Sequence, residues 1–253
     1  MKMMHMKRIK KSLLPIVAVI VAAIVLWFSG LDRQIRYSDS VMDVPDFAGD
    51  PYVIINQNVP EFTRDELRAE AYEYYSELDL LGRCSYAMAC IGEELMPSEE
   101  RERISHIKPT GWHSVEYDFV DGSSLYNRCH LIGFQLTGEN ANARNLITGT
   151  RYMNVEGMLP FENMVADYIE DTGNHVLYRV TPVFDGANLV ARGVQMEAMS
   201  VEDDGMGLCF HVYVYNNQPG VQIDYATGES GLDGTERSRN IYIDWLLDFL
   251  DAA

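Results

Sequence analysis

The first hydrophobic feature of the chain is an unbroken apolar run from Leu13 to Phe28, which follows five basic residues. At about 1.5 Å per residue in a helix, the run is close to the thickness of a bilayer core. The basic flank is expected on the cytoplasmic side. We therefore predict that residues 1–30 form a cytoplasmic basic stub and a transmembrane helix, with the rest of the chain outside the cell. Secretion after signal cleavage is the alternative.

The segment after this run changes from polar to periodic. Residues 31–50 are polar without a sustained period, which is typical of a tether. Residues 52–56 form a short β-like run. Apolar and aromatic residues then recur at helical spacing over 62–80, after a capping box made by Thr63 and Glu66. This pattern predicts a helix from Phe62 to Leu80.

The middle of the chain predicts the order strand, strand, helix. Residues 112–120 alternate between hydrophobic and polar, the Asp-Gly pair at 121–122 supplies a turn, and the chain returns from Leu125 as the second strand of a hairpin. Helical spacing holds over 154–172, with Gly173 as the stop signal.

The C-terminal part predicts more strands and a last helix. Three runs at 175–184, 189–199 and 208–215, separated by polar turns, are typical of an antiparallel meander. Residues 241–250 have the spacing of an amphipathic helix. Together these elements predict an α+β fold with an antiparallel sheet in a single domain at 51–253, whose strand-strand-helix core spans about 112–172.

Charge complicates the choice of function. The chain is 47% hydrophobic and 23% charged, which excludes a disordered protein. Five of its 20 basic residues precede the apolar run, and all 38 acidic residues follow it. The part after the run therefore has 15 basic and 38 acidic residues, a net charge of −23. Nucleic-acid surfaces are normally basic, and the acidity favours a solubilising surface or an envelope interaction protein. Residues 126–162, however, hold three arginines against three glutamates.

The four cysteines, Cys84, Cys90, Cys129 and Cys209, have no CxxC spacing, which argues against a zinc site. Outside the cell, Cys84 and Cys90 can close a short loop as a disulfide. Buried free thiols are the alternative.

Among the six histidines, His130 has the most suggestive neighbours. It follows Arg128 by two residues, and an asparagine-rich segment leads from it to the helix that carries Asn154 and Glu162. Hydrolysis of a phosphodiester needs a base for water and a positive charge for the phosphorus oxygens. A neutral imidazole supplies the first. Mg²⁺ supplies the second, and one amide oxygen plus water-mediated carboxylate contacts can hold it.

Residues 126–133, Tyr-Asn-Arg-Cys-His-Leu-Ile-Gly, resemble the Asp-Arg-Gly-His signature of the DNA/RNA non-specific endonucleases, the ββα-metal or His-Me finger nucleases. The streptococcal DNA-entry and secreted nucleases are the most similar branch, and the resemblance covers about residues 83–225. It implies that His130 is the general base and that Asn154 is the direct protein ligand of Mg²⁺, with Mn²⁺ or Ca²⁺ as substitutes. Glu162, eight residues after Asn154, is then the residue that holds the waters of the metal.

The resemblance also implies a role for four further residues. Arg128 is expected near the scissile phosphate as part of the catalytic set. Asn145, nine residues before the metal-binding asparagine, is expected to bind substrate together with Arg151 and Arg83.

Two positions depart from the signature. Asn127 replaces an aspartate, and its amide can imitate the hydrogen bonds of that aspartate without the charge. Cys129 replaces a glycine, which makes a redox-sensitive thiol beside the general base conceivable.

The resulting hypothesis is a metal-dependent nuclease that cuts DNA and RNA without sugar preference. The alternative is a nucleic-acid-binding or DNA-uptake component with weak or no catalysis, of which the two departures would be the sign. The presence of His130, Asn154 and Glu162 together favours the enzyme. DNA, RNA and the membrane are the expected partners, and the sequence points to no protein partner.

Overall fold

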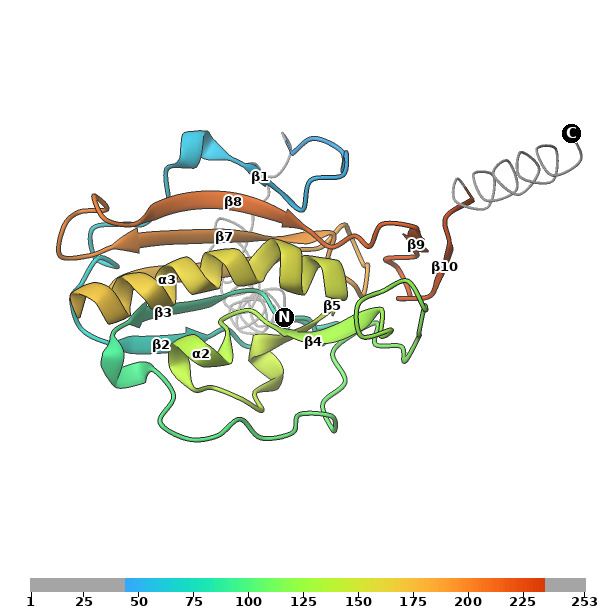
Figure 1. The fold of residues 1–253 in the computed structure, drawn as a ribbon, viewed down its shortest axis with the longest axis horizontal. Helices are drawn as coiled ribbons and strands as arrows, with labels where there is room; N and C mark the ends of the chain where they lie inside the picture. The colour runs from blue at the N-terminus through green and yellow to red at the C-terminus, as the bar shows by residue number, and fades with distance from the viewer. Residues whose placement is uncertain (1–43, 235–253) are drawn as a thin grey trace, which may run out of the picture. The chain divides into compact units, whose positions relative to one another are not determined.

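A computed structural model describes residues 44–234, and its central feature is a six-stranded antiparallel sheet with the strand order β1-β8-β7-β6-β3-β2 (Figure 1). The meander predicted from the C-terminal runs is confirmed, because β6 pairs with β7 and β7 with β8 in antiparallel register. The six strands are β1 (Tyr52–Ile54), β2 (Tyr72–Tyr75), β3 (Ala87–Ile91), β6 (Val176–Val183), β7 (Gly193–Ser200) and β8 (Cys209–Tyr215).

The remaining elements include two small two-stranded sheets and a few helices. β4 pairs with β5, and β9 pairs with β10. A π-helical turn, η4, leads directly into the longest described helix, α3. These elements are β4 (Tyr126–His130), β5 (Leu146–Thr150), β9 (Val221–Ile223), β10 (Ser230–Leu232), α2 (Phe134–Thr137), η4 (Met153–Met158), α3 (Leu159–Thr172), and the 3-10 turns η1 (Asn56–Asn58), η2 (Glu93–Leu95) and η3 (Ala143–Asn145).

The strand-strand-helix order is present, but one of its strands differs from the prediction. Residues 112–120 form only a single bridge, between Glu116 and Ser124, and the partner of β4 is β5, with His130 opposite Leu146. All five residues of β5 are buried. A strand buried on both faces has no hydrophobic alternation, which is why the sequence pattern did not reveal it.

The helix predicted from Phe62 to Leu80 is wrong. Its capping box does form, since the backbone N–H of Thr63 donates to the Glu66 carboxylate at 2.7 Å. The chain then continues into β2, which pairs with β3 along the edge of the large sheet. A cap cannot propagate a helix by itself, and the tyrosine-rich segment that follows favours a strand.

Helix α3 packs lengthwise on the large sheet, as Figure 1 shows. Phe161, Val165 and Ile169 of this helix belong to the main hydrophobic core. The centroid of the Phe161 ring lies 4.9 Å from that of the Phe210 ring in β8. The helix ends at Gly173, whose φ of 68° is the left-handed conformation that a stop glycine supplies. Burial of this face holds the start of α3 and the preceding π-turn close to β4.

All four cysteines are free thiols, so the disulfide between Cys84 and Cys90 is not formed. The Cys84 thiol donates to the carbonyls of Ala143 and Leu146, and the Cys90 thiol to the carbonyl of Arg68. The alternative of buried thiols holds for Cys84, Cys90 and Cys129, while Cys209 is exposed.

Within residues 44–234, no helix has both the length and the apolar character needed to cross a bilayer. The predicted transmembrane helix, most of the tether and the C-terminal helix at 241–250 lie outside the described residues.

Candidate active site

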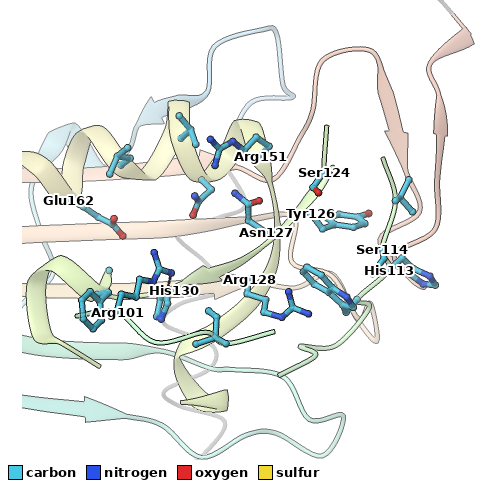
Figure 2. Close-up of a pocket in the computed structure, with 18 of the residues that line it drawn as sticks. Arg101, His113, Ser114, Ser124, Tyr126, Asn127, Arg128, His130, Arg151 and Glu162 are labelled. Carbon is cyan, nitrogen blue, oxygen red and sulfur yellow. Dashed lines mark hydrogen bonds between the residues drawn. The ribbon is translucent and has the colours of Figure 1, made fainter. Parts of the chain in front are cut away.

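A cavity of about 1020 Å³ lies over β4, the start of α3 and the irregular segment that precedes β4. Five of the seven predicted site residues line this cavity: His130, Arg128, Glu162, Asn154 and Arg151. Figure 2 shows His130 and Glu162 near one end of it and Arg128 further along the same strand. Residues from β4, η4 and α3 therefore meet as the strand-strand-helix order requires.

His130 is the last residue of β4, and only 6% of it is exposed. Its Nε2 lies 2.8 Å from the backbone oxygen of Asn140. A carbonyl can only accept, so Nε2 carries the proton and Nδ1 keeps its lone pair. Nδ1 in turn lies 3.4 Å from Nη2 of Arg101, which can donate to it.

The electrostatic surroundings keep this imidazole neutral. Burial lowers the pKa of His130 to about 4, and the positive charge of Arg101 acts in the same direction against the opposing hydrogen bond to Asn140. At neutral pH, His130 is therefore a base with an available lone pair.

Glu162 lies in the first turn of α3 with its carboxylate buried against Gly133. Burial raises the pKa of Glu162 to about 7, although Arg101 and the backbone N–H of Gly133 both favour the ionised form. A Cβ at position 133 would lie 2.7 Å from Glu162 Oε2. A side chain at position 133 would displace the Glu162 carboxylate, which explains the glycine three residues after His130.

Asn154 lies inside the π-helical turn rather than at a helix cap, since the N-cap of the turn is Tyr152. Its side chain is half-buried and lines the cavity. No residue of the described chain donates to or accepts from its carboxamide. Isolated π-turns are frequent at functional sites. The Asn154 amide oxygen in this turn is available as a metal ligand at the cavity.

Arg128 is fixed by the irregular segment before β4. Its Nη2 donates to the carbonyl of Ser105 at 2.9 Å, its Nε donates to the carbonyl of Ile107, and its guanidinium carbon lies 4.0 Å from the centroid of the Trp112 ring. Carbonyls do not cancel its charge, and no carboxylate in the described residues pairs with it.

Arg101 likewise has no ion-pair partner within residues 44–234, whereas Arg151 pairs with Asp121 at 2.8 Å. The guanidinium groups of Arg101 and Arg128 therefore lie at this cavity without an ion pair among residues 44–234, and the charge of Arg101 acts on the Glu162 carboxylate.

Asn145 does not line the cavity and is fully buried, so the predicted substrate contact is wrong for this residue. Its Nδ2 donates to the carbonyl of Ile132 at 3.0 Å, and its Oδ1 accepts from the backbone N–H of Ile132 at 2.9 Å. Its own carbonyl accepts from the N–H of Leu131. Asn145 thus positions the backbone that follows His130.

Arg83 lies outside the cavity as well, because it is held elsewhere. It pairs with Asp79 at 2.7 Å, donates to the carbonyls of Gly186 and Asn188, and lies over the ring of Phe184. This set of partners corrects its predicted role to a structural one.

Cys129 is completely buried in the main core. Its thiol packs on Gly149 of the neighbouring strand, where any Cβ would collide with the sulfur. Burial also raises the pKa of the thiol well above its usual range. The idea of a redox-sensitive thiol beside the base is therefore wrong, and Gly149 makes room for the side chain that replaces the signature glycine.

Sequence reasoning missed Arg101, which contacts the base from an irregular segment 29 positions earlier in the chain. No period or spacing distinguishes it from the neighbouring Arg103. Asn127, the other departure from the signature, does line the cavity.

The comparisons with known proteins agree with this geometry. The DNA/RNA non-specific endonuclease family model matches residues 63–202. A deoxyribonuclease of Streptococcus dysgalactiae subsp. equisimilis is 34% identical over 111 residues, which are 42% of this chain and 33% of the relative. This match spans about a third of the length of that relative.

Two solved nuclease structures resemble the fold. NucA from Streptococcus agalactiae with a magnesium ion bound has a TM-score of 0.66 and 26% identity over 79% of this chain and 95% of its own. The Sda1 nuclease with a bound zinc ion has a TM-score of 0.55 and 27% identity over 73% of this chain and 96% of its own. With a family model that covers more than half of its residues, this chain belongs to the DNA/RNA non-specific endonuclease family.

Proposed function

We propose that this protein is a Mg²⁺-dependent endonuclease that hydrolyses the phosphodiester bonds of DNA and RNA, with His130 as general base. The observation that carries the proposal is a neutral His130, protonated on Nε2, in one cavity with the Asn154 amide, the Glu162 carboxylate and the guanidinium groups of Arg101 and Arg128.

The residues present fit a hard, hydrated cation. Among residues 44–234 the Asn154 carboxamide has no hydrogen-bond partner, and the Glu162 carboxylate accepts from the backbone of Gly133. Both side chains offer oxygen, which Mg²⁺ prefers, and an ion that keeps several waters needs few protein ligands. No cluster of three histidine, cysteine or acidic residues able to hold a metal occurs within residues 44–234, which disfavours a site with an all-protein shell. Mn²⁺ and Ca²⁺ fit the same oxygen donors.

We assign Asn154 as the direct ligand and Glu162 as the residue that orients the waters of the ion. When bound, the ion would neutralise charge on the phosphate and stabilise the departing oxygen.

The protein's own residues divide the remaining work. Nδ1 of His130 accepts the proton of the attacking water, while the carbonyl of Asn140 holds Nε2–H and fixes the ring. Arg101 contacts Nδ1 in this structure and has to release it when water takes that position. Arg101 and Arg128 can then bind the phosphate oxygens, because neither forms an ion pair within residues 44–234.

The alternative of a binding or uptake component without catalysis loses its main support. It rested on the departures at Asn127 and Cys129, and the Cys129 side chain is buried in the core away from His130. We further propose that the domain acts outside the cell and is held there by the apolar segment at 13–28, because that segment follows a basic flank.

The test uses the full-length chain in detergent with supercoiled plasmid and with RNA, in Mg²⁺ or in chelator. We expect both substrates to be cut only with the metal, and His130→Ala to lower the rate by about 10²–10⁴-fold. His106→Ala is the matched control, because His106 is exposed and does not line the cavity. Intact substrates under Mg²⁺, or a His130→Ala variant as fast as wild type, would refute the proposal.

A further inference from the structure

The cavity extends well beyond the catalytic residues. Its far part, here called the distal end, is lined by Trp112, His113, Ser114, Ser124 and Tyr126. In Figure 2, His113, Ser114 and Tyr126 lie on the opposite side of Arg128 from His130 and Glu162. The roles assigned above to metal, base and phosphate binding use none of these five residues.

The distal end differs chemically from the catalytic end. Trp112 is partly buried and packs against a second, small hydrophobic cluster that includes Tyr126, of which only 3% is exposed. Ser114 and Ser124 are exposed residues of the same lining. An indole ring near hydroxyl groups fits a planar heteroaromatic ligand with a hydrogen-bonding edge.

The wall of the distal end is preformed. Tyr126 donates from its hydroxyl to the carbonyl of Gly228 at 2.9 Å, and His113 Nε2 lies 3.2 Å from the carbonyl of Thr227. A Cβ on Gly228 would collide with the carbonyl oxygen of Gly111. Two loops far apart in sequence therefore close tightly behind this part of the cavity, and a ligand meets a wall that is already in place.

Strand geometry relates the distal end to the scissile phosphate. Tyr126, Arg128 and His130 alternate along β4, so they share one face at steps of about 7 Å. Arg128, whose guanidinium lies over the Trp112 ring, is placed between His130 at one end of β4 and Tyr126 at the other. A nucleic-acid strand whose phosphate lies at Arg128 and His130 brings a neighbouring nucleotide to the distal end.

We propose that the distal end is a nucleobase subsite, in which Trp112 contacts the base of a nucleotide adjacent to the scissile phosphate, the buried Tyr126 supports the wall behind it, and the hydroxyls of Ser114 and Ser124 meet the polar edge of the base. The inference rests on the proposed nuclease function and deepens it. Contact with the face of a base tolerates any sequence, which agrees with a family of non-specific nucleases.

The test uses oligonucleotides with one cleavable phosphodiester among methylphosphonate linkages, and with an abasic residue placed immediately 5′ or 3′ of it. For the full-length chain with Mg²⁺, we expect the abasic residue on one of the two sides to lower kcat/KM by about tenfold. Trp112→Ala should bring this ratio close to one, and Trp112→Phe should keep most of it. Both substrates present the same phosphate, so a shift of Arg128 in the variant lowers both rates and leaves the ratio unchanged.

Tyr74→Ala is the matched control, because its ring is exposed on β2 and does not line the cavity. It should keep the wild-type ratio. Equal rates on base-containing and abasic substrates would overturn the subsite, and so would a ratio that survives Trp112→Ala. If Trp112→Ala does not fold, Trp112→Phe and the wild-type ratio remain, and a wild-type ratio of one still overturns the subsite.

A second measurement separates the subsite from the proposed function. The dissociation constants of the same oligonucleotides for the His130→Ala chain, measured by fluorescence anisotropy, should differ by about tenfold in the same sense. A wild-type chain that cuts neither oligonucleotide refutes the nuclease function, and the ratio of dissociation constants then decides the subsite alone.

Discussion

Replacing Asn145 with alanine removes a buried carboxamide that holds both backbone groups of Ile132. The two hydrogen bonds, of 3.0 Å and 2.9 Å, are fully enclosed. The N–H and the carbonyl of Ile132 would be left in the protein interior without these partners. Each such group costs about 1–3 kcal/mol, so we expect Asn145→Ala to lower the free energy of unfolding by about 2–6 kcal/mol.

The same substitution should change catalysis in a characteristic way. Ile132 lies two residues after His130, and a slack backbone there moves the imidazole relative to Asn154 and Glu162. A displaced base lowers the rate of the chemical step, so kcat should fall while KM changes little. A substrate contact by Asn145 would instead raise KM and leave the folding stability unchanged.

Urea unfolding followed by tryptophan fluorescence measures the stability, and plasmid cleavage under Mg²⁺ gives kcat and KM. Asn163→Ala is the matched control, because this asparagine is exposed on α3 and should change stability by no more than about 0.5 kcal/mol. An Asn145→Ala chain as stable as this control, with a raised KM, would show that the positioning role is incorrect.

Three further outcomes follow from the site and the sheet. Gly133→Ala should abolish most of the activity, since the added Cβ displaces the Glu162 carboxylate; an active variant with unchanged metal affinity would contradict this. Because burial lowers the pKa of His130 to about 4, the ring signals of His130 in an NMR titration should shift with a midpoint near pH 4. A midpoint near 6.5 in that titration would argue for an unperturbed histidine. Glu197→Gln breaks a fully buried ion pair with Arg179 and should lower the free energy of unfolding in urea by about 3–5 kcal/mol. A loss under about 1 kcal/mol would show that this ion pair does not stabilise the fold.

The sequence by itself determined the features whose signals are local. Three runs separated by polar turns predicted the strands of the C-terminal meander, and helical spacing with Gly173 predicted the end of α3. The motif around His130 and the eight-residue separation of Asn154 and Glu162 predicted three side chains that the fold brings to one cavity. Period and spacing survive folding because they reflect which face of a single element is buried.

The tertiary structure alone decided which segments pair and which polar residues are accessible. Strand β5 is buried throughout and carries no alternation, and β2 replaces a helix because an edge of the sheet was available to it. Burial then separated residues of similar sequence character: Asn145 became a backbone support, while Asn154 kept a free carboxamide in the cavity. Arg101 reaches the base only because a long irregular segment folds back over β4. Such contacts depend on partners far apart in the chain, and a pattern along one segment does not contain them.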